Sequence, residues 1–144
     1  MQSDERRTAL AARILVVEDD GVLRELLVNV LRRACFAAAG ASNGSDALEQ
    51  LAEGHFDLML SDVRMSPVGG LALVSRAKAL APDIKVLLMT AYAQSAEARL
   101  ARAAGADSYL SKPFPMADLL KTVRALVRRR LRPGKRVMED QDRP

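Results

Sequence analysis

The chain has 144 residues, enough for one domain of ordinary size and too few for two. Hydrophobic residues make up 49% and aromatic residues only 3%, so aliphatic side chains must fill the core, and the formal net charge is +4. The single cysteine, Cys35, excludes an intrachain disulfide and favours a reducing compartment. No stretch resembles a signal peptide or reaches the ~20 apolar residues of a membrane helix. We therefore expect a cytoplasmic protein with no membrane partner.

Short apolar runs alternate along the chain with segments of helical spacing. The run 13–17 predicts a first strand, and apolar pairs every three to four residues predict a helix over 21–34 with Asp20 as its N-cap. The weaker, alanine-rich run 36–41 predicts a second strand. A turn rich in Ser, Asn and Gly then precedes a predicted helix over 46–53.

The second half of the chain continues the same alternation. Pro82 and Gly105 mark the ends of helices, and Pro115 suits the first turn of another. In chain order, the predicted elements are a strand over 58–60 that runs into Asp62, a helix over 71–80, a strand over 84–89, a helix over 94–104, a strand over 108–111 and a last helix that ends near residue 130.

Five strand–helix units predict a parallel sheet covered by helices on both faces. With right-handed crossovers, they favour the flavodoxin-like doubly wound (βα)5 fold with strand order 2-1-3-4-5. We expect a flexible extension over 1–11, the folded domain over 12–130 and a basic, polar, disordered tail over 131–144, with no room for an output domain.

Ionisable and hydroxyl side chains follow the predicted strands at the edge where their carboxyl ends meet. Glu18 and Asp19 follow the first strand, Asp62 the third, Thr90 the fourth and Lys112 the fifth. Two like charges about 4 Å apart repel by roughly 4 kcal/mol near a protein surface, so three carboxylates need compensating charge. An all-oxygen donor set favours Mg²⁺, and the absence of His or Cys from this pattern argues against zinc.

A magnesium site beside a lysine and a threonine suits phosphoryl transfer. The cations neutralise the transferring oxygens, the hydroxyl donates a hydrogen bond, and a carboxylate can attack phosphorus to give an aspartyl phosphate. Asp62 is the best candidate for the nucleophile, because Glu18 and Asp19 form a natural metal-binding pair.

Four motifs now stand in order on the predicted elements: VVEDD, LSDVRM…GG, MTA and SKPF. Together they make the chain resemble the receiver domain of two-component response regulators over residues 12–129. The resemblance implies that Asp62 is the phosphoacceptor, that Glu18, Asp19, Asp62 and the backbone carbonyl of Arg64 hold Mg²⁺, that Thr90 and Lys112 contact the phosphoryl group, that Tyr109 is an aromatic switch coupled to Thr90, and that the Lys112–Pro113 peptide is cis.

The same resemblance implies partners. A sensor histidine kinase or a histidine phosphotransfer protein would donate the phosphoryl group. An unknown downstream protein would read the face formed by the helix at 94–104, the strand at 108–111 and the last helix, which is also a possible homodimer surface. One departure from the family pattern lies beside Asp62, where Ser66 displaces the usual proline to Pro67. The resemblance also implies that Arg64 and Tyr92 flank the route of the water that hydrolyses the phosphate, and because both side chains are large we expect a long-lived phosphate.

Other functions fit the sequence less well. A phosphatase of the haloacid dehalogenase type carries a second Asp two residues after its nucleophile, where this chain has Arg64. A shuttle in a phosphorelay without its own output remains an alternative. A flavin-based electron carrier would need a phosphate loop after the first strand, and this chain has none there. The basic run 128–132 suits a helix C-terminus better than specific DNA binding, which we do not expect. We expect no enzymatic activity beyond autocatalysed phosphorylation and dephosphorylation.

Overall fold

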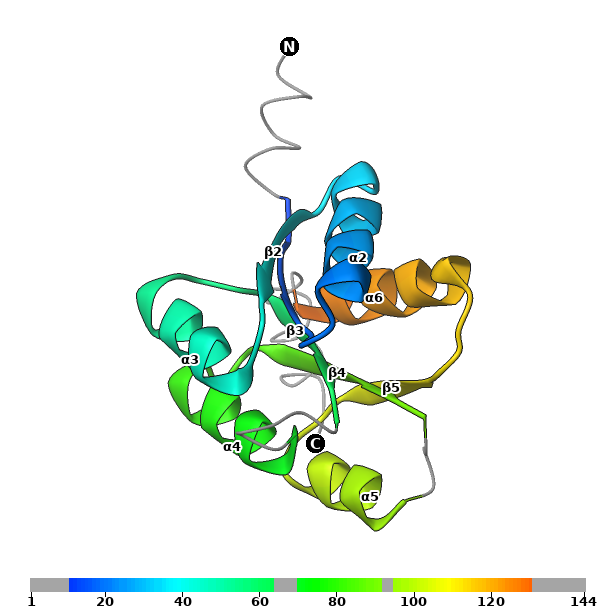
Figure 1. Ribbon diagram of the computed structural model, residues 1–144. Helices are drawn as coiled ribbons and strands as arrows, with labels where there is room; N and C mark the ends of the chain where they lie inside the picture. The colour runs from blue at the N-terminus through cyan, green and yellow to red at the C-terminus, as the bar shows by residue number, and fades with distance from the viewer. Residues whose placement is uncertain (1–10, 64–69, 92–94, 131–144) are drawn as a thin grey trace, which may run out of the picture.

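The computed structural model describes residues 11–63, 70–91 and 95–130, which form a five-stranded parallel sheet with helices on both faces (Figure 1). The strand order is β2-β1-β3-β4-β5, which confirms the predicted flavodoxin-like topology. The strands are β1 Arg13–Val17, β2 Ala37–Ala41, β3 Leu58–Asp62, β4 Lys85–Thr90 and β5 Ser108–Ser111. The helices are α2 Gly21–Arg33, α3 Gly44–Glu53, α4 Gly70–Leu80, α5 Ala96–Ala103 and α6 Met116–Arg130. No helix of the described part is long and apolar enough to cross a membrane.

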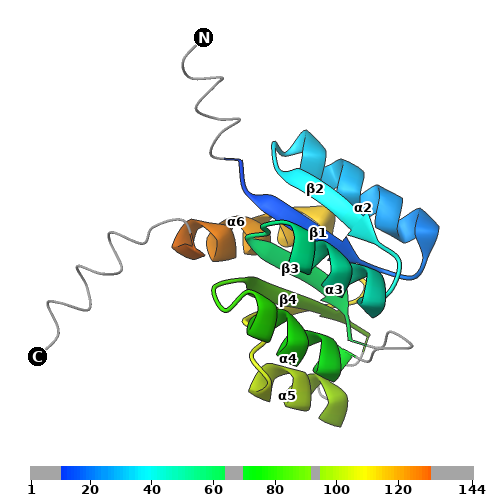
Figure 2. The ribbon, with the colours of Figure 1, turned by 90° about the vertical axis from the view of Figure 1, so that its left-hand side faces the viewer.

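The sheet separates two hydrophobic cores, because alternate side chains of each strand point to opposite faces. On β1, Leu15 and Val17 join the core covered by α3, α4 and α5, whereas Ile14 and Val16 join the core covered by α2 and α6. Figure 2 shows these two helical layers on either side of the sheet. Burial on both faces explains why β1, β3 and β4 appear in the sequence as strongly apolar runs, whereas the two edge strands β2 and β5 do not.

Local hydrogen bonds set the element boundaries, and they correct some of the expected ones. Asp20 caps α2 as predicted, since its carboxylate accepts from the backbone N–H groups of Val22 and Leu23. The strand β2 begins one residue later than expected, because the N–H of Phe36 still bonds back to Leu31 O at 3.0 Å. The helix α3 begins earlier than expected, at Gly44, because Asn43 is its cap.

The register of the sheet determines which strand ends meet. Val17 of β1 pairs with Ser61 of β3, so the residues that follow them, Glu18 and Asp62, extend from adjacent strands. Thr90 ends β4 opposite Ser111 of β5. The polar residues that follow the strands therefore lie along one edge of the sheet.

Candidate functional site

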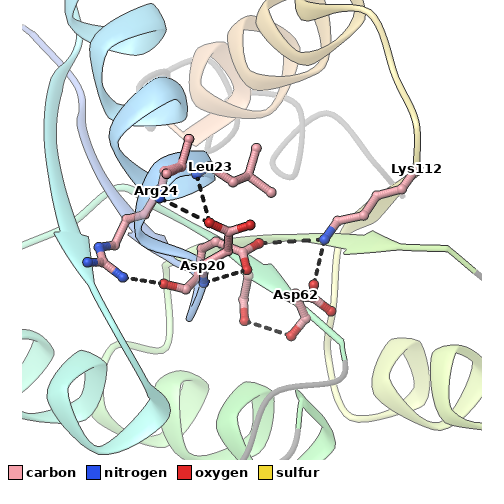
Figure 3. A network of polar contacts seen from close by, with 8 residues as sticks. Asp20, Leu23, Arg24, Asp62 and Lys112 are labelled. Carbon is pink, nitrogen blue, oxygen red and sulfur yellow. Dashed lines mark hydrogen bonds and ion pairs between the residues drawn. The ribbon is translucent and has the colours of Figure 1, made fainter.

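The edge of the sheet where Glu18 follows β1 and Asp62 ends β3 is the acidic edge. An ammonium group bridges these two carboxylates (Figure 3). Lys112 Nζ donates to Asp62 Oδ2 at 2.6 Å and lies 3.5 Å from Glu18 Oε1. The Asp62 side chain is 18% exposed, against 3% for Glu18, so Asp62 is the carboxylate that an incoming group can reach. Burial alone would lower the pKa of Lys112, but the hydrogen bond and charge of Asp62, with the charge of Glu18, raise it above its ordinary value. Lys112 therefore stays protonated and positively charged.

Three hydrogen bonds hold Glu18, and one oxygen of its carboxylate has no hydrogen-bond partner among the described residues. Its N–H donates to Ala41 O at 3.0 Å, its carbonyl accepts from Arg24, and its Oε2 accepts from the N–H of Asp20. Its buried Oε1 has no hydrogen-bond partner, because the contact with Lys112 is an ion pair too long for a good hydrogen bond. Burial is the main cause that raises the pKa of Glu18 above its ordinary value, and the nearby carboxyls of Asp19 and Asp62 raise it further.

These residues fit a hard divalent cation. The donor set consists of oxygens, and the buried Oε1 of Glu18 lacks the partner that a cation would provide. Among the described residues, no three His, Cys, Asp or Glu side chains meet closely enough to make a metal-binding set by themselves. Mg²⁺ does not need such a set, because it is usually bound by one or two carboxylates and keeps several waters. Asp19 lies beside Glu18 in the exposed part of the loop.

Thr90 and Lys112 come from neighbouring strand ends. Thr90 is 4% exposed, and its carbonyl accepts from the backbone N–H of Lys112 at 2.7 Å, which ties the two residues together. The Lys112–Pro113 peptide bond is cis. Tyr109 is half-buried on β5, with the Arg102 guanidinium of α5 4.7 Å from the centre of its ring.

Other residues singled out from the sequence lie elsewhere. Arg64, Ser66, Pro67 and Tyr92 fall outside the described residues, so the third metal ligand, the displaced proline and the phosphate lifetime stay predictions. Asp57 lies at the opposite edge of the sheet, as expected.

Asp57 has a structural role at that opposite edge. It accepts from the N–H of Arg13 at 2.9 Å and contacts the exposed His55 at 3.0 Å. These bonds join the start of β1 to the segment before β3, far from the acidic edge.

Sequence reasoning missed two features of the acidic edge. The first is Arg24, whose Nη1 donates to the Glu18 carbonyl at 2.7 Å. An arginine in the first turn after an acidic loop is a signal for such a contact, but the pattern does not show where its side chain goes. The second is an apolar pocket of about 500 Å³ beside Lys112. It is lined by Leu23, Ala91, Lys112, Pro113, Phe114 and Met116.

Comparison with known proteins identifies the family. The family model of the response regulator receiver domain matches residues 14–124. The chain is 37% identical over 120 residues to the response regulator MprA of Mycobacterium ulcerans, covering 83% of this chain and 52% of MprA. It is 44% identical over 110 residues to the transcriptional regulatory protein ZraR of Escherichia coli K12, covering 76% of this chain and 25% of ZraR. The chain belongs to the response regulator receiver family, and it spans about half of MprA and a quarter of ZraR.

Solved structures agree with the fold. A CheY-like receiver domain protein of Methanospirillum hungatei JF-1 has a TM-score of 0.80 and 27% identity, covering 83% of this chain and 96% of that one. A Burkholderia pseudomallei response regulator with a phosphorylated aspartic acid, a calcium ion and citrate has a TM-score of 0.72 and 29% identity, covering 91% and 73%. TrrA of Thermotoga maritima, in complex with Mg²⁺ and BeF, has a TM-score of 0.69 and 31% identity, covering 80% and 98%.

Proposed function

We propose that the chain accepts a phosphoryl group from a phosphohistidine onto Asp62, with Mg²⁺ bound by Glu18, Asp19, Asp62 and the backbone carbonyl of Arg64. The observation that carries the proposal is the contact of Lys112 with Asp62 at 2.6 Å beside the under-coordinated Oε1 of Glu18. A carboxylate oxygen of Asp62 forms the new bond to phosphorus as the bond from phosphorus to the imidazole nitrogen breaks. Mg²⁺ supplies charge neutralisation for the phosphoryl oxygens when it is bound.

The residues of this chain have distinct tasks in the transfer. Lys112 holds Asp62 in place before transfer and can pass its ammonium contact to the phosphoryl oxygens afterwards, since it already contacts the carboxylate to which the phosphoryl group becomes attached. Thr90, buried at the end of β4, donates its hydroxyl to the phosphoryl group. When Thr90 moves toward the phosphoryl group, Tyr109 turns inward. This shifts the equilibrium between two conformations of the face formed by α5, β5 and α6. That face is the proposed contact for the downstream protein and for a homodimer.

The phosphodonor is a histidine kinase or a histidine phosphotransfer protein. Apolar surface beside the acidic edge supports this partner: Val22 of α2 is 80% exposed and Leu26 is 47% exposed. Both lie on α2 within one turn of Leu23, which lines the pocket next to Lys112. A donor helix that covers this surface with apolar side chains can place its phosphohistidine over Asp62. Substitution of Val22 by Asp should slow transfer from a kinase and leave phosphorylation by a small phosphodonor unchanged.

The family membership favours a receiver over the phosphatase. The chain spans only part of relatives such as the transcriptional regulatory protein ZraR. We propose that this chain acts through a protein contact, with a phosphorelay shuttle as the alternative. We also propose a cytoplasmic location, no DNA binding and no other enzymatic activity.

Intact-mass spectrometry tests the phosphoacceptor. The chain is incubated with Mg²⁺ and acetyl phosphate and should gain the mass of one phosphoryl group. Asp62→Asn should gain none, whereas the matched control Asp83→Asn, at an exposed residue of the opposite edge, should behave as the wild type. No mass gain in the wild type, or an undiminished gain in Asp62→Asn, would contradict the proposal.

A further inference from the structure

One arginine holds the loop that carries two of the proposed metal ligands. This loop, residues 18–20, joins β1 to α2. Arg24 lies in the first turn of α2, where its backbone N–H donates to Asp20 O at 2.8 Å. Its side chain reaches back and donates from Nη1 to the carbonyl of Glu18 at 2.7 Å (Figure 3). On its other side, Glu18 is bound to β2, because its backbone N–H donates to Ala41 O. The peptide groups around Glu18 are thus fixed from both sides.

The stem of Arg24 reaches this position across a glycine. A Cβ atom at Gly40 of β2 would lie 3.1 Å from Cδ and 3.2 Å from Cγ of Arg24. Favourable carbon contacts lie at about 3.5–4.0 Å, so any side chain at this position would press on the stem. Gly40 is held in the sheet, where it pairs with Val16 of β1, and its carbonyl also accepts from Gln50 Nε2 at 3.0 Å. A side chain at Gly40 would therefore push the Arg24 stem, by a few tenths of an ångström, off its present path to the loop.

We infer that Arg24 is a positioning residue for the metal site and that Gly40 is the partner that lets it act. The inference rests on the proposed Mg²⁺ binding. Among the described residues, Arg24 contacts the backbone carbonyl of Glu18 and not its carboxylate, so it acts through the backbone of Glu18. If the Glu18 peptide turns, the carboxylates of Glu18 and Asp19 both move relative to Asp62. Partners that orient metal ligands typically change metal affinity by about 10- to 100-fold when they are removed.

Methionine at Arg24 separates the hydrogen bond from the packing. Arg24→Met keeps an unbranched stem over Gly40 and loses the donor, whereas Arg24→Lys restores a cationic donor. The chain offers a matched control: Arg32 of the same helix donates from Nε to a β2 carbonyl, that of Ala38, at 3.0 Å and away from the acidic loop. Arg32→Met therefore removes the same kind of bond between α2 and β2.

Two measurements distinguish a positioning role from a loss of stability. Calorimetric titration with Mg²⁺ should give a dissociation constant about tenfold higher for Arg24→Met, partly restored in Arg24→Lys and unchanged in Arg32→Met. In the metal-free protein, amide hydrogen exchange followed by NMR should quicken at Glu18 and Asp20 in Arg24→Met and not in Arg32→Met.

A double-mutant cycle tests the role of Gly40. Gly40→Ala should weaken Mg²⁺ binding in the wild-type background and have no further effect when Arg24 is alanine, because the stem it displaces is then absent. The single Gly40→Ala variant carries the test if Arg24→Met fails to fold. Unchanged Mg²⁺ affinity in Arg24→Met, or equal weakening in Arg32→Met, would overturn the inference alone. Absence of Mg²⁺ binding by the wild type would overturn the proposed function as well.

Discussion

Removal of the Lys112 ammonium should destabilise the metal-free protein, and Mg²⁺ should reverse the loss. Because this ammonium lies 2.6 Å from Asp62 and 3.5 Å from Glu18, the contacting carboxylate oxygens are close to each other. At about 6 Å apart, the greatest separation that these contacts allow, two unit charges repel by roughly 3 kcal/mol at the effective dielectric of a protein surface. Lys112 is 26% exposed and Asp62 18% exposed, so solvent screens part of this repulsion. We expect Lys112→Met to lower the free energy of unfolding by about 1–2 kcal/mol.

Urea unfolding of Lys112→Met and wild type, with EDTA and with saturating Mg²⁺, measures the effect. The deficit should be present in EDTA and shrink in Mg²⁺, because the bound metal supplies the missing positive charge. It should also shrink when Asp62→Asn is added, because one of the two charges is then gone. A deficit that is the same in EDTA, in Mg²⁺ and in the Asp62→Asn background would refute the electrostatic reasoning and assign the loss to packing of the lysine stem.

Three further predictions concern the same edge. Asp20→Ala removes the cap of α2 and should lower the free energy of unfolding by about 1 kcal/mol, measured by urea unfolding; no change would contradict the capping role. Thr90→Val should still gain phosphate at Asp62 but lose the resonance shifts at Tyr109 that phosphorylation causes in NMR spectra of the wild type; intact shifts would exclude Thr90 as the link. The folded-state pKa of Glu18 is raised from 4.5, so its contribution to stability is complete below that value and lost as pH rises through the raised pKa. In EDTA, Glu18→Gln should flatten the corresponding fall in stability between acidic and neutral pH, and an identical pH profile in the variant would contradict this account.

Much of the fold follows from local sequence because the inner strands β1, β3 and β4 are buried on both faces. A continuous apolar run such as Leu58–Leu60 has few other places to go, and a polar residue directly after it marks the carboxyl edge of the sheet. The strand order then follows from chirality and connection rules. The grouping of Asp62 with Glu18 and Lys112 was predictable for this reason, since it depends only on which strands are neighbours.

Side-chain reach and exact boundaries were not predictable in the same way. The path of Arg24 depends on Gly40, sixteen residues later, lying beside α2, which is a consequence of the β1–β2 register. The start of β2 depends on Phe36 keeping a bond to the end of α2. Such contacts form only once the helices have packed on the sheet, so no local sequence pattern predicts them.

The position of β1 inside the sheet, between strands that come later in the chain, bears on the order of assembly. The first strand lies between β2 and β3, so during synthesis it lacks its second neighbour until the chain has been made as far as Asp62. The β2-β1-β3 unit is therefore the smallest part of the sheet that brings Glu18 and Asp62 together. The lysine that balances them, Lys112, comes later in the chain, directly after β5, which is the edge strand farthest from β2. Any intermediate that pairs only the first three strands would therefore bring Glu18 and Asp62 together without the cation that balances them in the complete fold.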